Sequence, residues 1–354
     1  MGERATDDIE VIIPNLHWRY SGVTATNRLM APRIARMVRA VWCGRDRPDG
    51  IAALGFTGLL RLRLRAPQRQ PVRIWHARRN DEMMIGLLLK LLGWRLGLVF
   101  TSVAQRHHTW ITRFLMRRMD AIIAASRASA SYLKVPAVMI PHGIDTRVHQ
   151  PPGDRAAAFA AGGLPGRYAI GCFGRVRAQK GTDVFVEAMC RLLPQYPDFS
   201  AVIVGAITPE HQPFAAALQE KIAAAGLSDR IRFLGEVPID EVPRWYQRVT
   251  IYAFTSRNEG FGLTLLEAMA AGAALVAARA GAAEEVVRDG DTGVLVPPGN
   301  ADALAEALRP LMADPAKAQE MGARARAQIL AEYDADREAA RIVEVYRSVW
   351  AARA

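Results

Sequence analysis

The chain has 354 residues, of which 51% are apolar, and a formal net charge of +11. This length is long for a single core, so the chain is expected to form two globular domains. Its three cysteines include no C-x-x-C pair, which argues against a zinc site and for a reducing compartment.

The net positive charge of the chain comes from its first half. Residues 1–165 contain 25 Lys and Arg but only 11 Asp and Glu. This asymmetry indicates an anionic partner for the first half: nucleic acid, anionic lipid or a phosphorylated substrate. Since no nucleic-acid-binding motif accompanies the charge, we expect no nucleic acid partner. The N-terminal sequence MGERATDDIE is polar and acidic, unlike a signal peptide, and favours a cytoplasmic protein.

Short apolar runs alternate with segments of helical composition along the whole chain. In the first half, five runs are predicted to be strands buried on both faces: IEVIIP (9–14), VRIWHA (72–77), LGLVFTS (96–102), AIIAAS (121–126) and AVMIPHG (137–143). The most apolar stretch, residues 85–100, is interrupted by Lys90 and Arg95. It is too short to span a bilayer and predicts a buried helix followed by a strand.

A stretch rich in Pro, Gly and Ala, residues 150–167, marks the domain boundary. Six further strands are predicted after it: YAIGCFG (168–174), SAVIVG (200–205), IRFLGEV (231–237), TIYAFTS (250–256), AALVAAR (273–279) and GVLVPP (293–298). The alternation predicts an α/β protein with two parallel-sheet domains, 1–160 and 161–354. We expect the last helix, about 335–354, to pack back on the first domain.

The loop GRVRAQKG (174–181) follows the first strand of the second domain. In it, Gly174 and Gly181 bracket Arg175 and Lys180. Arg grips phosphate oxygens through two parallel N–H bonds, and Lys supplies a compact charge. Because ligands of parallel sheets bind beyond the carboxyl ends of the strands, the loop predicts a diphosphate clamp, with an exposed basic turn as the alternative.

A second loop, SRNEGFGLTLLEAMAAG (256–272), places Glu259 and Glu267 eight residues apart. A turn containing Gly260 and Gly262 precedes a run of helix formers, so Glu267 is expected one turn inside a helix whose free N–H groups favour an anion. Carboxylates also accept hydrogen bonds from sugar hydroxyls. The loop therefore fits a phosphate flanked by sugars, with a solvated capping Glu as the alternative.

Together these motifs resemble the retaining nucleotide-sugar glycosyltransferases of family 4, which have the GT-B fold. Besides the G-R-x-x-x-x-K-G turn and the E-x7-E spacing, the resemblance rests on PHGID (141–145), FLGEV (233–237) and DGDTGVLVPPGN (289–300). It covers nearly the whole chain. It implies two Rossmann-like domains facing a central cleft, the first binding the acceptor and the second the nucleotide sugar.

The resemblance also implies a role for each motif residue. Arg175 and Lys180 would hold the donor diphosphate, Glu267 the ribose hydroxyls and Glu259 the transferred sugar. Further donor contacts are implied for Gly22, Gly174, Gly260, Phe261, Gly262, Leu263 and Thr264, although the double glycine usual around Gly22 is missing. His76 stands where the family often has a His near the donor sugar, which implies a catalytic role, with a structural His as the alternative.

Two segments, WHARRNDEM (75–83) and residues 101–126, are similar to bacterial lipopolysaccharide core mannosyltransferases. The similarity implies transfer of mannose from GDP-mannose to a lipid-linked or lipopolysaccharide core acceptor. Alternatives are a UDP-sugar-dependent hexosyltransferase of cell-envelope glycan synthesis, a GT-B epimerase or phosphorylase, and a non-catalytic sugar-binding module. No carboxylate is clearly placed as a nucleophile, which favours front-face attack. His107 and His108 lack spaced metal-ligating partners, so no metal or other cofactor is expected.

Basic residues in the first domain suggest where the acceptor binds. Arg78 and Arg79 are either acceptor contacts or solvated charges. Residues 110–118 interleave Trp110 and Phe114 with three arginines, Arg113, Arg117 and Arg118, and residues 59–69 add four more. Because a basic residue near anionic lipid gains about 1 kcal/mol, we expect a peripheral protein on the inner face of the cytoplasmic membrane.

Overall fold

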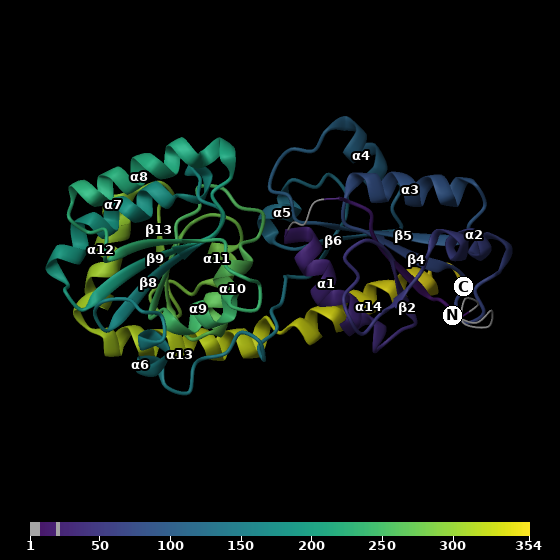
Figure 1. Cartoon of the computed structure of the whole chain (residues 1–354). Coiled ribbons are helices and arrows are strands. Elements are labelled where there is room, and N and C mark those ends of the chain that lie inside the picture. The colour runs from purple at the N-terminus through teal and green to yellow at the C-terminus, as the bar shows by residue number, and fades with distance from the viewer. Residues whose placement is uncertain (1–7, 19–21) are drawn as a thin grey trace. The chain divides into compact units, whose positions relative to one another are not determined.

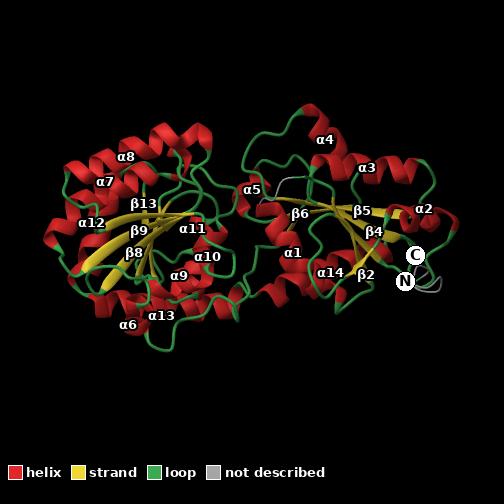
Figure 2. Cartoon of the chain, viewed as in Figure 1, coloured by secondary structure: helices red, strands yellow, loops and turns green. Residues whose placement is uncertain are grey.

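The computed structural model describes residues 8–18 and 22–354. The predictions made from most of the N-terminal sequence and from the start of the loop before Gly22 lie outside the described residues. The chain divides into two compact units: unit 1 comprises the described residues up to Gly143 together with Ala335–Ala354, and unit 2 is Ile144–Asp334. Each unit has one parallel sheet with helices on both faces (Figures 1 and 2).

The first crossing between the units follows Gly143, so the predicted boundary after residue 160 is wrong. The intervening segment contains helix α6 (Arg155–Ala160), which is held in unit 2 by the guanidinium of Arg155. That group donates to the carbonyl oxygens of Val249 at 2.7 Å and Gly272 at 3.0 Å. The Pro- and Gly-rich composition therefore marks a segment that packs on unit 2, and not the linker itself.

The C-terminal helix α14 (Ala335–Ala351) belongs to unit 1. It lies beside α1 (Gly22–Ala35), as Figure 1 shows in yellow and purple. Tyr346, Val349 and Trp350 are buried in the core that the two helices share with the sheet. The last helix thus returns to the first sheet after the chain has completed unit 2.

In the described residues, unit 1 has a seven-stranded sheet in the order β3-β2-β1-β4-β5-β6-β7. The strands are β1 (Val11–Asn15), β2 (Ala40–Gly44), β3 (Ala52–Ala53), β4 (Arg73–Ala77), β5 (Leu96–Ser102), β6 (Ala121–Ala124) and β7 (Val138–Met139). The remaining helices are α2 (Phe56–Leu64), α3 (Asn80–Leu91), α4 (Trp110–Met116) and α5 (Arg127–Ser131). All five predicted strands are confirmed, and β2 and β3 are additional.

Strand β1 explains why the runs of unit 1 are apolar without alternation. Val11 and Ile13 face the cluster that includes α1 and α14, whereas Ile12 faces a second cluster with Trp75 and Leu59. Successive side chains of a strand point to opposite faces, so a sheet covered on both faces needs apolar residues at every position.

In the described residues, unit 2 has a six-stranded parallel sheet in the order β10-β9-β8-β11-β12-β13. The strands are β8 (Tyr168–Phe173), β9 (Phe199–Val204), β10 (Ile231–Gly235), β11 (Ile251–Phe254), β12 (Ala274–Ala278) and β13 (Val294–Val296). The remaining helices are α7 (Thr182–Leu192), α8 (Gln212–Ala224), α9 (Val242–Arg248), α10 (Leu263–Ala270), α11 (Ala283–Val286), α12 (Ala301–Ala313) and α13 (Pro315–Glu332), with 3-10 turns η2 (Ala178–Lys180), η3 (Leu193–Gln195) and η4 (Pro209–His211). The six predicted strands are confirmed.

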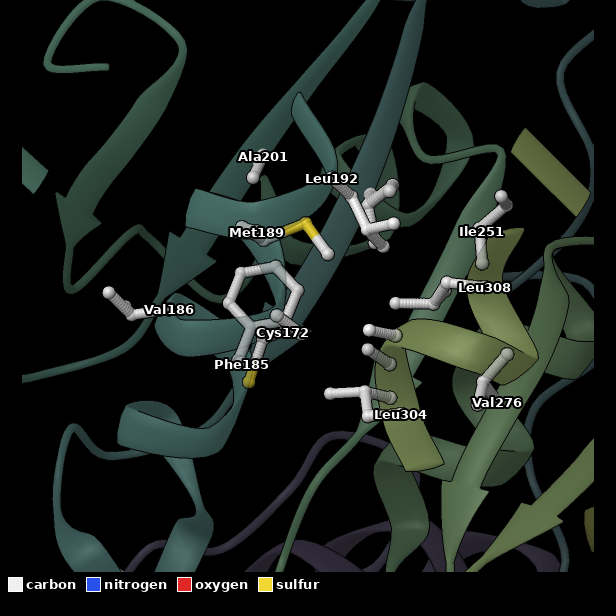
Figure 3. Packing of buried hydrophobic residues seen from close by; sticks show 14 of the residues in the cluster. Cys172, Phe185, Val186, Met189, Leu192, Ala201, Ile251, Val276, Leu304 and Leu308 are labelled. Atoms are coloured by element: carbon white, nitrogen blue, oxygen red, sulfur yellow. The ribbon is translucent and has the colours of Figure 1, made fainter. Parts of the chain in front are cut away.

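The core of unit 2 fixes the start of α7, which follows the first predicted loop. Phe185, Met189 and Leu192 of α7 pack against Leu304 and Leu308 of α12 on one face of the sheet (Figure 3). All five side chains are at most 1% exposed. Because these residues are fully buried, α7 cannot shift without opening the core, and the loop before it is held in place.

Candidate active site

Both predicted loops lie at the carboxyl edge of the unit 2 sheet, on adjacent strands. Strand β8 pairs with β9 on one side and with β11 on the other. The chain order therefore reverses direction at β8, and ligands of open parallel sheets bind beside such a switch point. The loop after β8 carries Arg175 and Lys180, and the loop after β11 carries Glu259.

The structure brings Lys180 and Glu259 into contact. The ammonium group of Lys180 forms an ion pair with Oε2 of Glu259, and the two side chains are 19% and 21% exposed. Oε2 of Glu259 also accepts from the hydroxyl of Ser256 at 3.4 Å, and Oε1 accepts from the amide of Gly260 at 3.2 Å. A cation and a carboxylate thus meet at one partly open point of the sheet edge.

Gly181 allows the two loops to approach each other. It adopts the left-handed conformation, with φ of 68°, between η2 and α7. A Cβ atom added there would overlap the carbonyl oxygen of Thr255 and lie 2.7 Å from its carbonyl carbon. The hydroxyl of Thr255 donates to the carbonyl of Lys180 at 2.9 Å. Only glycine fits this position without moving the second loop.

Further polar contacts, which the sequence did not predict, join the same two loops. The guanidinium of Arg257 donates to both carboxylate oxygens of Asp183, at 2.7 and 2.8 Å. The amide of Arg257 donates to the carbonyl of Gln179 at 2.8 Å. This contact could have been predicted from the sequence, because opposite charges shortly after β11 and in the first turn of α7 both lie at the carboxyl edge of the sheet.

Helix α10 carries Glu267 as predicted. It begins after Gly262, which has a φ of 97°, and Glu267 lies one turn inside it. The hydroxyl of Tyr246 donates to Oε2 of Glu267 at 2.7 Å. Burial, and next the charge of Glu267, raise the pKa of Tyr246, so the phenol remains a donor. The carboxylate therefore has a fixed orientation near the helix N-terminus, where free N–H groups favour an anion.

The first loop carries two further cations beside Lys180. Arg175 is exposed, and no hydrogen bond or ion pair of its guanidinium occurs among the described residues. Arg177 is half-buried, and its Nε is buried without a hydrogen-bond partner in that part of the chain. Sequence reasoning omitted Arg177, although its place two residues after Arg175 was the available signal. Gly174, Phe261, Leu263 and Thr264 lie in these two loops or at the start of α10, as predicted.

The predicted catalytic role of His76 does not fit its position. The side chain is 1% exposed, and its ring nitrogens contact the hydroxyls of Tyr346 at 2.5 Å and Thr101 at 2.7 Å. Burial, and next the charge of Arg78, lower its pKa well below the usual 6.5. A neutral histidine with both nitrogens occupied cannot reach a substrate, so we correct the prediction to a structural role in tying β4 to α14.

Arg79 is also held within unit 1. Its guanidinium donates to Asn15 at 2.9 Å, Thr24 at 2.8 Å and Glu82 at 3.2 Å. Arg79 therefore joins β1, α1 and α3, and is not a simple solvated charge. Gly22 is the first residue of α1, directly after residues that the structure does not describe. The donor contact expected for Gly22 stays a prediction.

The arginine of α4 and the two that directly follow this helix lie among exposed apolar side chains. Trp110 is 71% exposed, and the guanidinium carbon of Arg118 lies 4.0 Å from the centre of the Phe114 ring. Arg117 and Arg118 are exposed and Arg113 is half-buried. Within residues 8–18 and 22–354, no helix is long and apolar enough to cross a membrane.

The D-x-D sequence at Asp289 and Asp291 forms a turn. Asp289 accepts from the amide of Leu295 at 2.9 Å, and Asp291 pairs with Arg324 at 2.8 Å. No group of three His, Cys, Asp or Glu side chains suited to hold a metal ion occurs in the described part of the chain.

Comparison with known proteins identifies a matching family and close relatives of the chain. The profile of the family described as Glycosyl transferases group 1 matches residues 154–328. Over 344 residues, and 97% of each chain, the protein is 48% identical to the lipopolysaccharide core biosynthesis mannosyltransferase LpcC of Rhizobium leguminosarum bv. viciae. It is 43% identical to the lipopolysaccharide core biosynthesis mannosyltransferase LpsB of Rhizobium meliloti (strain 1021), over 97% of this chain and 98% of LpsB.

A solved structure shares the fold over nearly the whole chain. The crystal structure of Anabaena Alr3699/HepE in complex with UDP and glucose matches with a TM-score of 0.80, over 96% of this chain and 100% of that one. The identity of 21% supports the likeness in fold and nothing finer.

Proposed function

The chain belongs to the glycosyl transferases group 1 family, and we propose that it transfers mannose from GDP-mannose to a lipopolysaccharide core acceptor with retention of anomeric configuration. It is a glycosyltransferase with the two parallel-sheet, α/β architecture of the GT-B fold. The names of its 48% and 43% identical relatives support mannose as the sugar and the lipopolysaccharide core as the product.

The observation that carries the proposal is the contact between Lys180 and Glu259 at the β8 and β11 edge. A nucleotide sugar combines a diphosphate with sugar hydroxyls on both sides, so its site needs cations and carboxylates side by side. In our proposal Lys180 and Arg175 neutralise the diphosphate, and the N–H groups that open α10 complete the phosphate site. Glu267 accepts from the ribose hydroxyls, and Glu259 from those of mannose.

Both carboxylates already pair with other side chains and are not free to act as nucleophiles, which favours front-face attack. Glu259 is paired with Lys180, and Glu267 accepts from Tyr246. In the proposed step, the bond between the anomeric carbon and the diphosphate oxygen breaks, and the acceptor hydroxyl oxygen bonds to the same face of that carbon. The hydroxyl proton passes to the departing diphosphate. Stabilising the charge that develops on this leaving group is the task of Lys180 and Arg175.

We further propose that this charge stabilisation needs no metal ion. Lys180 and two arginines of one loop supply the positive charge that a divalent cation provides in other diphosphate sites. Activity measured with and without chelator tests this part of the proposal.

Unit 1 is proposed to bind the acceptor at the inner face of the cytoplasmic membrane. The excess of basic residues lies in the first half of the chain, and α4 exposes Trp110 and Phe114 beside arginines in the helix and directly after it. Amphipathic helices with aromatic and basic side chains bind the headgroup region of anionic bilayers. A lipid-linked acceptor would be met at that surface.

The test is a transfer assay with the purified protein, GDP-mannose and a lipopolysaccharide core acceptor. We expect an α-mannosyl product from the α-linked donor. UDP-glucose serves as the comparison donor, because the HepE structure holds UDP and glucose. Transfer from a UDP-sugar alone would replace the proposal with the UDP-dependent alternative, and isomerisation of the donor without acceptor would indicate an epimerase.

A further inference from the structure

Unit 1 contains a cavity of about 660 Å³ at the carboxyl edge of its sheet. Its lining residues lie at the end of β5, in the segments that follow β1, β4 and β5, and in the first turns of α1, α3 and α4. The volume lies within the range of about 300–1,000 Å³ that is usual for small-molecule sites. All the described lining residues belong to unit 1, whereas Arg175 and Lys180, which are predicted to hold the diphosphate, belong to unit 2.

The lining of this cavity is strongly basic. Arg78, Arg79 and Arg106 contribute to it, and Asp81 is the carboxylate among the described lining residues. Asp81 is exposed and accepts a hydrogen bond from the amide of Glu82 at 3.0 Å. A concave surface with this balance of charge attracts anions.

Arg78 is the buried cation of the cavity. It is 6% exposed, and its Nε has no hydrogen-bond partner among the described residues. The one hydrogen bond of its guanidinium in that part of the chain is a long one, 3.4 Å to the hydroxyl of Thr26. Burial lowers the pKa of Arg78, and the charge of Glu338 is the largest opposing influence. A buried charge is costly unless it is paired directly.

The carboxylates that influence Arg78 are committed to other donors. Glu82 accepts the backbone amides of Arg78 at 2.7 Å and Arg79 at 3.1 Å, together with the side chain of Arg79. Glu338 accepts from the ring of His142 at 2.9 Å and from the amide of Gly143 at 2.8 Å. Neither carboxylate forms an ion pair with the guanidinium of Arg78 in the described contacts. The pairing that this buried cation needs is left to a ligand.

Two further polar atoms lining the same cavity lack partners. Oγ of Ser102 and Nε2 of His108 are buried without a hydrogen-bond partner among the described residues. Burial, and next the charge of Arg106, lower the pKa of His108, so its ring is neutral near pH 7. Buried polar atoms are almost always hydrogen-bonded, so several unpaired ones around one cavity indicate a site suited to a polar ligand.

We propose that this cavity holds an oxyanion of the acceptor, a carboxylate or a phosphate group, paired with Arg78. Ser102 and His108 would hydrogen-bond the same group, and Arg106 would lie at the exposed rim. Naming the acceptor as the source rests on the proposed function, whereas the binding of an oxyanion does not. The rim continues into α4, where Trp110 is exposed, so the lipid part of an acceptor could remain at the surface.

The first test uses ligand-detected NMR on the full chain with two probes, inorganic phosphate and D-glucuronate, and with D-glucose as the neutral control. We expect at least one anion to bind and glucose not to bind, and the anion that binds names the chemistry. Arg78→Gln, Ser102→Ala and Arg106→Gln should each weaken binding at least tenfold. Arg95→Gln removes an exposed arginine of unit 1 outside the cavity and should bind as the parent does.

Three results would overturn the inference. The first is failure of both anions to bind the parent. The second is equal binding by the parent and by the Ser102 and Arg106 variants, which change too little of the core to unfold it. The third is one-for-one displacement of the bound anion by GDP, since the cavity would then belong to the donor.

A transfer assay separates this inference from the proposed function. With GDP-mannose and a core acceptor, Arg106→Gln should raise the KM for the acceptor at least tenfold and leave the KM for GDP-mannose unchanged. If the parent transfers no mannose but the variants lose anion binding, the proposed function fails and the oxyanion site stands. If transfer occurs and both KM values are unchanged in this variant, the acceptor assignment fails.

Discussion

Substitution of Gly181 by Ala tests the contact between the two loops, because the chain offers a matched control. Gly226 has the same φ of 68°, also lies in unit 2, and has open space where a Cβ would be added. Both substitutions impose the left-handed conformation on alanine, which costs about 1–2 kcal/mol. Only at Gly181 does the new methyl group overlap the backbone of Thr255.

The additional cost at Gly181 follows from what the methyl group displaces. Moving Thr255 away breaks the 2.9 Å hydrogen bond to Lys180 and the 2.8 Å bond from Arg257 to Gln179. At about 0.5–1.5 kcal/mol each, these losses make Gly181→Ala about 1–3 kcal/mol less stable than Gly226→Ala. Since about 1 kcal/mol shifts the Tm of a domain of this size by about 2–4 °C, the two variants should melt about 2–12 °C apart.

The assay combines thermal melting with titration of GDP-mannose. We expect Gly181→Ala to bind the donor at least about tenfold more weakly, because the clash separates Lys180 from Glu259, which corresponds to about 1.4 kcal/mol. Gly226→Ala should bind the donor as the parent does. Equal melting temperatures and equal donor affinities in the two variants would refute the close approach of the loops and its role in binding.

Tyr246→Phe removes the donor to Glu267 and should raise the KM for GDP-mannose with little change in kcat; an unchanged KM would contradict the ribose role of Glu267. Because the pKa of His76 is lowered in the fold, the unfolded state binds more protons below about pH 6.5, and the free energy of unfolding should fall by up to about 1.4 kcal/mol per pH unit on acidification. Urea titrations at several pH values should show that His76→Gln has a shallower dependence of this free energy on pH. An equal dependence in the parent and the variant would show that His76 is charged in the fold. Transfer should survive EDTA, and an absolute requirement restored by Mn²⁺ or Mg²⁺ would show that a metal site exists. Sedimentation with anionic vesicles should detect binding that weakens as the salt concentration rises. Replacing Arg113, Arg117 and Arg118 by Ser should also weaken it. If this triple variant binds vesicles as the parent does, these arginines are only a solvated face.

The sequence allowed most of the sheet strands to be predicted, because buried parallel strands are continuous apolar runs. Strand β2 (Ala40–Gly44) was missed. Residues 34–42 have apolar side chains at 34, 35, 37, 38, 40, 41 and 42, which fits the continued face of a helix as well as a new strand. The pairing of β2 with β1 decides between the two, and that contact is not local.

The candidate site, too, could be predicted from the sequence only in part. Lys180 and Glu259 could be expected near each other because both follow parallel strands and therefore share one edge of the sheet. The role of His76 could not be predicted, since its partner Tyr346 is 270 positions away and belongs to a helix that returns after unit 2 is complete. The buried state of Arg78 likewise depends on packing within unit 1 that no local pattern records.

The most direct measurement for the account as a whole is the kcat of mannose transfer from GDP-mannose by Lys180→Ala. Removing one group that stabilises a developing anion costs about 10²–10³ in kcat, or about 2.7–4 kcal/mol, so we expect a loss of about 100-fold or more. The partly exposed ion pair with Glu259 contributes about 1 kcal/mol or less to stability, so the Tm should fall by no more than about 4 °C. Lys221→Ala, which removes an exposed lysine paired with Glu187 in the same unit, should keep the parental kcat. Parental turnover in Lys180→Ala would contradict the assignment of this sheet edge as the site where the diphosphate leaves.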